Sequence, residues 1–375
     1  MITGGRDGAG AVTVRHRADV VGSLLGPAEL HEARLAHAAG SMSAAEYKRV
    51  EDRAVDEIIA MQEQAGVDIV TDGELRRTHF AGPLIDACDG LEDKPAPERP
   101  YYGPDGEPLV NTTPRSVTSP LRLRRGLVTE EFTYARARTR KPVKMTLPAP
   151  TNLVHFWSPE HSREAYPDPF ALFADATEVL RVQIAELTRL GCTDIQLDAP
   201  ELATVIDETQ RRHYAQVGVD PDRLVEEGIE MLDELAASTD ARMSLHLCKG
   251  SKYRGWAASG GYDAIAGRVF RRATNFDAFL LEYDDERSGS FEPLAALPDD
   301  KIVVLGLIST RRAEIEPLEL VRERVEEAAR YHPREQLAIS TQCGFASGLV
   351  GDAEKLSFQR AKLERVAEAA HSLWR

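Results

Sequence analysis

Short apolar runs alternate with longer amphipathic stretches along almost the whole chain. Short runs rich in Val, Ile and Leu are typical of buried strands. Eight segments of this kind are expected to form strands: 18–23, 67–74, 141–150, 193–200, 241–250, 277–284, 301–310 and 336–345. Because nearly all of them are separated by segments of helical hydrophobic spacing, the pattern predicts repeated strand–helix units and therefore parallel strands.

The amphipathic stretches give the expected helices. Ser43 and Glu46 have the spacing of a capping box, which predicts that a long helix begins there. Residues 75–140 break the rhythm, because they contain EDKPAPERPYYGPDGEP, which is rich in proline, glycine and charge. We expect this excursion to carry a hairpin or a small subdomain. Further helices are expected near 168–190, 221–238, 261–273, 316–331 and 353–373.

Eight strand–helix units fit a (β/α)8 barrel of the TIM type. The sequence predicts one domain over residues 1–375, with an insertion at 75–140 after the second strand. A doubly wound open sheet is the alternative fold. No G-x-G-x-x-G follows the first predicted strand and no Walker A motif occurs, so the sequence does not support nucleotide binding.

Several ionisable side chains lie at the C-terminal ends of the predicted strands, where barrels of this type build their active sites. His246 and Cys248 end the fifth strand two residues apart, so they point to one face. Glu282 ends the sixth strand and Cys343 the eighth. Any one of them alone is more simply a packed or ion-paired residue. Together, one nitrogen, two sulfur and one oxygen ligand suit tetrahedral Zn²⁺.

Composition limits the partners and the compartment. The chain of 375 residues has a net charge of −15, which argues against nucleic acid and anionic membrane partners. No apolar run approaches membrane-spanning length, and the start of the chain lacks the apolar core of a secretory signal. Cys88 and Cys192 bring the cysteines to four, and a long chain of this kind favours reduced thiols and a cytoplasmic location.

The combined motifs resemble the catalytic C-terminal barrel of cobalamin-independent methionine synthase. HLC at 246–248, the glutamate of LLEYD and the cysteine of QCGF are similar to the zinc-binding pattern of that family. VVGS, DIVTDGE and QLDAP match the same barrel in order and spacing, from about residue 17 to 371. The resemblance implies zinc-dependent transfer of a methyl group, normally from a folate, to a thiol, normally that of homocysteine.

The resemblance also implies roles by position. The zinc ligands would be the four residues named above. The catalytic and amino-acid-binding carboxylates would be Glu74 and Asp198, with a backbone contact at Ser23 and a folate-stacking ring at Trp157.

The chain departs from the family pattern at the proton donor. Methionine synthase has a histidine implicated in proton transfer at the end of strand seven, whereas this chain has Ser309 near that place. Removal of a methyl group from a folate nitrogen needs a general acid. His79, His155 and Asp284 are the candidates to replace the missing histidine.

The substrates are less well defined than the metal chemistry. The chain is similar to the shorter, single-barrel relatives, whose substrates vary and include coenzyme M with epoxides. Methyl transfer to homocysteine from a methyl-folate or a simpler donor is the favoured function. An epoxide:coenzyme M-type alkyltransferase, a non-catalytic zinc-binding barrel, and a decarboxylase or corrinoid-linked methyltransferase are the alternatives. Arg76 and Arg77 could bind a substrate carboxylate or sulfonate, or could form a surface ion pair.

Overall fold

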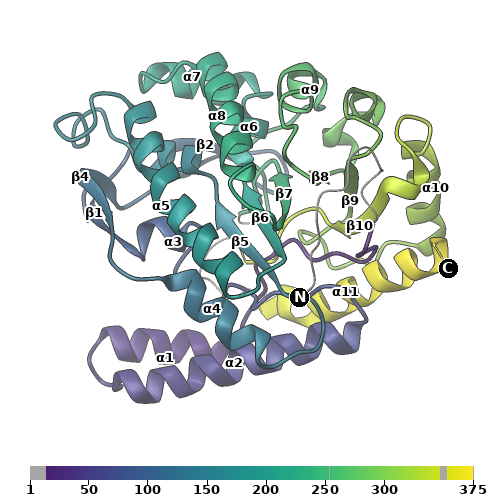
Figure 1. Cartoon of the computed structure of the whole chain (residues 1–375), viewed down its shortest axis with the longest axis horizontal. Helices are drawn as coiled ribbons and strands as arrows, with labels where there is room; N and C mark the ends of the chain where they lie inside the picture. Colours follow the sequence, from purple (N-terminus) through teal and green to yellow (C-terminus); the bar gives the residue numbers. More distant parts are fainter. Residues whose placement is uncertain (1–13, 253, 347–352, 375) are drawn as a thin grey trace.

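A parallel sheet of six strands lies at the centre of the molecule (Figure 1). The computed structural model describes residues 14–252, 254–346 and 353–374. Each pair of neighbouring strands in the central sheet is parallel. Their Val, Ile and Leu composition fits strands that are buried on both faces. In spatial order the strands are β10 (Leu337–Thr341), β9 (Ile302–Ile308), β8 (Ala278–Glu282), β7 (Arg242–Leu247), β6 (Asp194–Asp198) and β5 (Lys144–Pro148).

The two segments expected to supply the first strands make only short contacts with this sheet. Ala18 bridges Ile339 of β10, and Val70 bridges Val143 just before β5, both in parallel. A hydrogen bond of 2.9 Å from the backbone N–H of Asp68 to the carbonyl of Ala18 joins the two segments. The regular sheet therefore contains six of the eight expected strands, and a closed eight-stranded barrel stays a prediction.

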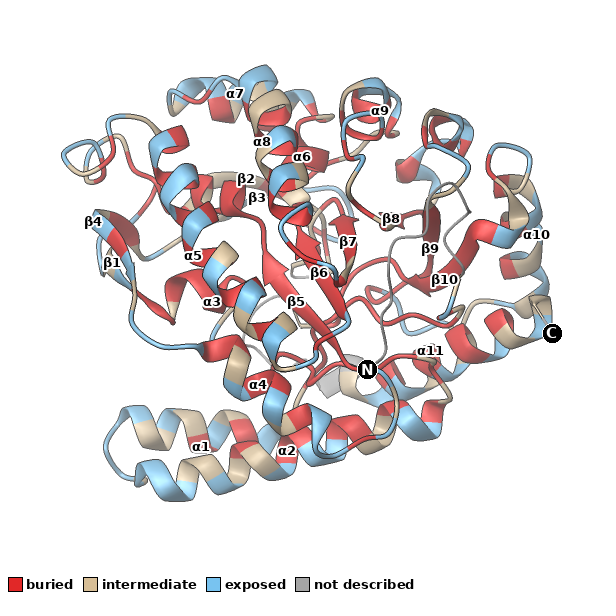
Figure 2. Cartoon of the chain, in the orientation of Figure 1, coloured by how far each residue is buried: buried red, intermediate tan, exposed pale blue. Residues whose placement is uncertain are grey.

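Helices cover the sheet, with their buried faces turned inward (Figure 2). The side chain of Ser43 accepts from the N–H of Glu46, and the Glu46 carboxylate accepts from the N–H of Ser43, so the predicted capping box is confirmed. The expected helices are α2 (Ala44–Ala65), α5 (Pro169–Arg189), α8 (Pro221–Ala236), α9 (Asp263–Val269), α10 (Leu318–Ala328) and α11 (Ala353–Leu373). The hydrophobic pattern did not predict α1 (Ala28–Ala38), α6 (Pro200–Thr204) and α7 (Glu208–Gln216).

Residues 75–140 hold two antiparallel strand pairs between two helices. The helices are α3 (Gly82–Ile85) and α4 (Leu127–Arg136). The outer strand pair is β1 (Cys88–Glu92) with β4 (Ser116–Leu123), and the inner pair is β2 (Arg99–Tyr102) with β3 (Pro108–Asn111). The expected hairpin is the inner pair.

The inner pair reaches the loop that follows β7. Tyr102 and Trp256 exchange two backbone hydrogen bonds, of 2.8 and 3.0 Å. The side-chain amide of Gln210 donates to the carbonyl of Pro100 at 2.8 Å. These contacts hold β2 against the same end of the sheet at which His246 and Cys248 lie.

None of the helices in the described ranges is both long and apolar enough to cross a membrane. The first 13 residues of the chain, where the absence of a secretory signal was predicted, lie outside the described residues.

Candidate metal centre and substrate pocket

Three of the four expected zinc ligands form one buried group, which we call the metal group. One ligand atom each of His246, Cys248 and Cys343 lies within 4.8 Å of the others. His246 belongs to β7, Cys248 follows that strand directly, and Cys343 follows β10. The two sulfur atoms are 3.6 Å apart. The fold thus brings together residues that are 95 positions apart in the sequence.

The imidazole of His246 is oriented for metal binding. Its Nδ1 lies 2.8 Å from Oδ1 of Asp198, and a carboxylate only accepts, so Nδ1 carries the proton. In the neutral imidazole the lone pair is therefore on Nε2, and this buried atom has no hydrogen-bond partner among the described residues. Burial alone would lower the pKa of His246, but the hydrogen bond and the charge of Asp198 raise it. Metal-binding histidines commonly have this carboxylate partner.

The two thiols of the metal group are coupled. The hydrogen bond to Cys343, together with burial, raises the pKa of Cys248 well above its ordinary value. Two buried sulfurs at this separation share a proton, and a cation between them would displace it. Cys88 and Cys192 lie outside the metal group, and burial raises the pKa of each to about 12. A soft divalent metal therefore fits the donor atoms of the metal group.

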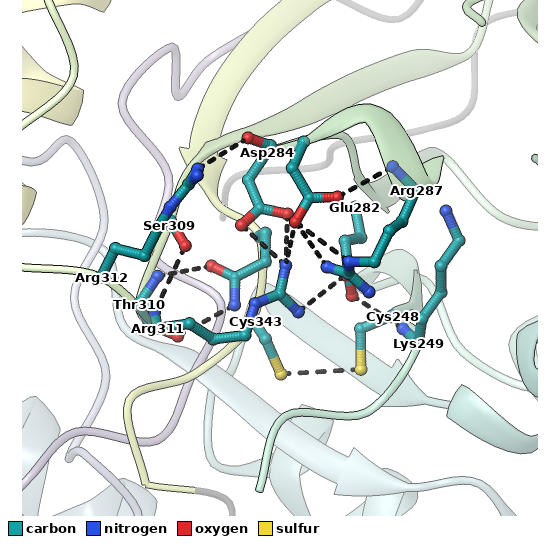
Figure 3. Close-up of polar contacts among 12 residues, drawn as sticks. Cys248, Lys249, Glu282, Asp284, Arg287, Ser309, Thr310, Arg311, Arg312 and Cys343 are labelled. Atoms are coloured by element: carbon teal, nitrogen blue, oxygen red, sulfur yellow. Dashed lines mark hydrogen bonds and ion pairs between the residues drawn. The ribbon is translucent and has the colours of Figure 1, made fainter. Parts of the chain in front are cut away.

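Glu282, the fourth expected ligand, is held by cations beside the metal group (Figure 3). Its Oε1 accepts from Nη1 of Arg311 at 3.0 Å and lies 3.5 Å from Nη2 of Arg287. Its Oε2 accepts from the backbone N–H of Lys249 at 2.8 Å. Burial opposes ionisation, but the charge of Arg311 lowers the pKa of Glu282. The carboxylate is ionised, and its role as a metal ligand stays a prediction.

Arg311 is a residue of this region that the sequence did not reveal. It lies two positions beyond Ser309 in the sequence. Its guanidinium donates to both oxygens of Asp284, at 2.7 and 2.8 Å, and to Asp285 at 3.2 Å. Asp284 lines a separate cavity with Arg311, so the structure does not bring this candidate acid to the metal group.

The metal group lines a pocket of about 130 Å³. Because ligand pockets for drug-sized molecules measure roughly 300–1,000 Å³, this space suits a small acceptor. Arg99 and Tyr101 of β2 also line it, and the sequence gave no signal for either. The remaining expected site residues around the pocket are Ser23, Glu74 and Asp198.

Glu74 is held by local backbone geometry. It has a φ of 58°, directly after Gly73 at 71°, so the chain turns sharply and ends the extended segment. Its Oε1 accepts from the hydroxyl of Thr146 at 2.8 Å. A Cβ atom on Gly22 would lie 2.7 Å from that oxygen, so only glycine leaves room for it. Burial raises the pKa of Glu74, and the negative charge of Asp198 adds to this effect. The positive charge of Arg77 opposes it, and the resulting pKa is about 8.

Ser23 is joined to the segment that carries Cys343. The carbonyl of Ser23 accepts from the N–H of Phe345 at 2.8 Å. A Cβ atom on Gly344 would lie 2.0 Å from the hydroxyl oxygen of Ser23 and 3.1 Å from its carbonyl oxygen, so glycine allows the Ser23 side chain to pack against this backbone. This contact fixes the wall of the pocket beside the sulfur atoms.

Trp157, the expected folate-stacking residue, lies in the core, and its role stays a prediction. Its ring is buried in the apolar core, and its indole N–H donates to the carbonyl of Tyr166 at 3.1 Å. It is not among the described residues that line the pocket, whereas His155, the last residue of the turn Pro150–His155, does line it. The ring of His155 stacks on Tyr214, with centroids 6.2 Å apart.

Two of the three candidate proton donors line the pocket. They are His79 and His155. Burial, together with the charges of Lys252 and Arg99, lowers the pKa of His79 to about 4. Burial and Arg99 hold the pKa of His155 well below its ordinary value. Both imidazoles are therefore neutral at neutral pH.

Arg76 and Arg77 form buried ion pairs, and neither expectation for them holds. Arg76 donates to Glu51 and Asp52, at 2.6 Å each. Arg77 donates to Glu131 at 2.8 Å, and both side chains are fully enclosed. These arginines already have carboxylate partners within the protein, so they are neither a surface pair nor available for a substrate anion.

Comparisons with known proteins agree with this geometry. The family model described as the catalytic domain of the cobalamin-independent synthase matches residues 17–371. The uncharacterized protein YxjH of Bacillus subtilis is 34% identical over 96% of this chain and 95% of its own. A methionine synthase of Saccharolobus solfataricus is 24% identical over 87% of this chain and 86% of its own.

Solved structures show the same fold. A putative vitamin-B12 independent methionine synthase from Listeria monocytogenes matches with a TM-score of 0.73 and 25% identity, over 97% of this chain and 99% of that one. A B12-independent methionine synthase from Shewanella matches with a TM-score of 0.72 and 20% identity, over 95% of this chain and 97% of that one.

The fold and the strand-end site define a methyltransferase of the methionine synthase type. The chain belongs to the cobalamin-independent methionine synthase family, through its catalytic domain. The resemblance found in the sequence is thereby confirmed.

Proposed function

We propose that this protein catalyses zinc-dependent transfer of a methyl group to the thiol of homocysteine, which gives methionine. The observation that carries the proposal is the buried metal group, in which Nε2 of His246 lies beside the sulfurs of Cys248 and Cys343 and has no hydrogen-bond partner within the described ranges. Family membership supports the reaction class. The metal group offers one nitrogen and two sulfur ligands, a set that zinc prefers.

Glu282 would complete the ligand set. Each carboxylate oxygen has two lone pairs, so the hydrogen bonds from Arg311 and Lys249 leave acceptor capacity. When bound, zinc would keep a substrate thiol deprotonated, and the thiolate is the reactive nucleophile. Arg311 would act as a positioning residue, since it fixes the carboxylate of Glu282.

Glu74 and Asp198 would bind the amino group of the acceptor. Both line the pocket beside the metal group, and both present acceptor atoms. Asp198 would have two tasks, because the same carboxylate orients His246. A sulfur lone pair then forms the bond to the methyl carbon, while the bond from the methyl group to the donor breaks and its electron pair stays with the donor.

The choice of methyl donor depends on whether the pocket can protonate the nitrogen that loses the methyl group. His79 and His155 are neutral at neutral pH, whereas Glu74 retains a proton because its pKa is about 8. Glu74 is thus the group among these three that holds a proton before the acceptor binds, and the ammonium group of the acceptor would displace that proton. The donor would be a methyl-folate with a short tail or a simpler methyl compound.

The test is a methyl-transfer assay with the purified protein. Homocysteine is supplied with mono- or triglutamate methyl-folate, or with a simpler methyl donor, and zinc is removed and restored. The proposal predicts methionine formation that requires zinc and depends little on tail length. Turnover of coenzyme M in preference to homocysteine would contradict the acceptor assignment. No zinc-dependent thioether with any donor would contradict the function.

A further inference from the structure

Arg99 is a cation in the pocket that has no carboxylate partner among the residues that the structure describes. It lies on β2, and its guanidinium contacts Nε2 of His155, another residue of the pocket wall. No carboxylate of the described residues lies within ion-pair distance of Arg99, and its buried Nε has no hydrogen-bond partner there. The other two arginines considered for substrate binding, Arg76 and Arg77, are both paired with carboxylates.

The neighbours of Arg99 do not neutralise it. His155 and His213 both have lowered pKa values, through burial and the charge of Arg99, with His213 at about 4. Burial raises the pKa of Glu201 to about 7, and the charge of Arg99 has a smaller effect that lowers it. The carboxyl group of Glu201 accepts a hydrogen bond from the hydroxyl of Thr151. A half-buried guanidinium that faces a pocket and has no carboxylate of the described residues within ion-pair distance favours an anionic ligand.

The strand β2 aims this charge at the space beside the sulfurs. Arg99 and Tyr101 are two residues apart on β2 and both line the pocket, as alternation along a strand requires. Tyr101 lines the same pocket as Cys248 and Cys343, and burial raises the pKa of its hydroxyl. One small ligand can therefore contact the sulfurs and Arg99 together.

We propose that Arg99 binds a carboxylate of the ligand that occupies this pocket. The assignment deepens the proposed function and rests on it for the identity of the ligand. The carboxylate belongs either to the acceptor amino acid or to an acidic methyl donor, and both present the same chemistry to a guanidinium. In the first case Glu74 and Asp198 receive the ammonium group and Arg99 receives the carboxylate of one zwitterion.

The experiment compares Arg99→Gln with the wild type by calorimetric titration of the zinc-loaded protein. The probes are L-methionine and 3-(methylthio)propylamine, which lacks only the carboxylate. Arg122→Gln, on the exposed part of β4, is the matched control. For an acceptor carboxylate, we expect Arg99→Gln to bind methionine roughly 10- to 100-fold more weakly and the amine unchanged. Arg99→Lys should recover part of the affinity, because it keeps the charge but not the planar fork.

The KM of the methyl donor distinguishes the two sources. If methionine binding is unchanged but the KM of the donor rises in Arg99→Gln, the carboxylate belongs to the donor. Loss of methionine binding in Arg99→Gln without any turnover by the wild type would support Arg99 while contradicting the proposed function. Unchanged methionine affinity and unchanged donor KM in a folded variant would overturn the assignment. Arg99→Met replaces Arg99→Gln if the latter does not fold.

Discussion

The imidazole of His246 and the carboxylate of Asp198 act as one unit at the residue scale. The carboxylate fixes which nitrogen carries the proton, and the other nitrogen is left free toward the metal group. Asp198 also accepts from the amide of Gln196 at 2.8 Å, so its own orientation is set by β6. A change at Asp198 therefore affects both metal affinity and acceptor binding.

We predict that Cys248→Ser and Cys343→Ser each lose most of the bound zinc and essentially all turnover, while the fold is retained. A hydroxyl is a poor replacement for a thiolate as a zinc ligand. The measurement is metal content by atomic emission, with circular dichroism to check folding. Cys192→Ser, a buried cysteine outside the metal group, is the control and should keep its zinc. Normal zinc content in either variant would remove that cysteine from the ligand set.

We predict that methionine binding at pH 7 releases about one proton from Glu74. Its pKa of about 8 means that the free carboxyl is mostly protonated, and an arriving ammonium group lowers that pKa. Calorimetry in buffers of different ionisation enthalpy measures the release. It should shrink above pH 8 and be absent in Glu74→Gln. An equal release from Glu74→Gln would assign the proton to another group.

Side-chain identity at the strand ends could be predicted, but side-chain partners could not. His246, Cys248 and Cys343 follow from strand periodicity, because each position is fixed by its own strand. Arg311 pairs with Glu282 from a different strand end, and only packing decides such a pairing. Trp157 lies in the core, whereas His155, at the end of the turn Pro150–His155, lines the pocket, and strand periodicity does not describe such a turn.

At the scale of elements, the β2–β3 hairpin links the excursion to the metal group. The backbones of β2 and of the loop after β7 pack so closely that a Cβ atom on Gly255 would lie 1.9 Å from the carbonyl oxygen of Tyr102. The position of β2, and with it Arg99, therefore depends on this contact.

We predict that Gly255→Ala raises the KM of the substrates and lowers the melting temperature modestly. The added methyl group forces β2 away from the loop, whereas the metal group itself does not touch Gly255. Steady-state kinetics and zinc content measure the two effects separately. Gly267→Ala in α9, where an added Cβ meets nothing within 4 Å, should behave as the wild type. Unchanged KM in Gly255→Ala would mean that β2 does not shape the pocket.

Helices with a strong hydrophobic periodicity could be predicted from the sequence, whereas the short strands within residues 75–140 could not. The closing helix was expected at 353–373 and is found at Ala353–Leu373. In contrast, β2 and β3 contain Pro100 and Pro108 and show little alternation, so their pairing depends on the loop they meet. The first two expected strands were read from apolar runs, but each makes only an isolated bridge.

At the scale of the whole molecule, a buried ion pair at the start of β6 couples stability to pH. Asp194 lies 3.3 Å from Arg242 and 3.6 Å from His16. Burial would raise the pKa of Asp194, but these partners lower it from 3.8 to about 2. The stabilisation is fully present above pH 3.8 and is lost as the pH falls through 2.

We predict that Asp194→Asn lowers the free energy of unfolding by about 2–3 kcal/mol near neutral pH. The difference from the wild type should shrink between pH 4 and pH 2, because the wild-type carboxyl is protonated over that range. Denaturant titrations at several pH values measure it. A difference that does not depend on pH would show that the ion pair is not the source of the stability.

The central claim is that Cys248 and Cys343 hold a zinc ion to which the acceptor thiol binds. X-ray absorption at the zinc edge tests it most directly, on the purified protein with and without homocysteine. The account predicts one zinc ion per chain with two sulfur neighbours, from the two cysteines, and a third sulfur when homocysteine is added. A protein without zinc, or a sulfur count that homocysteine does not change, would contradict it.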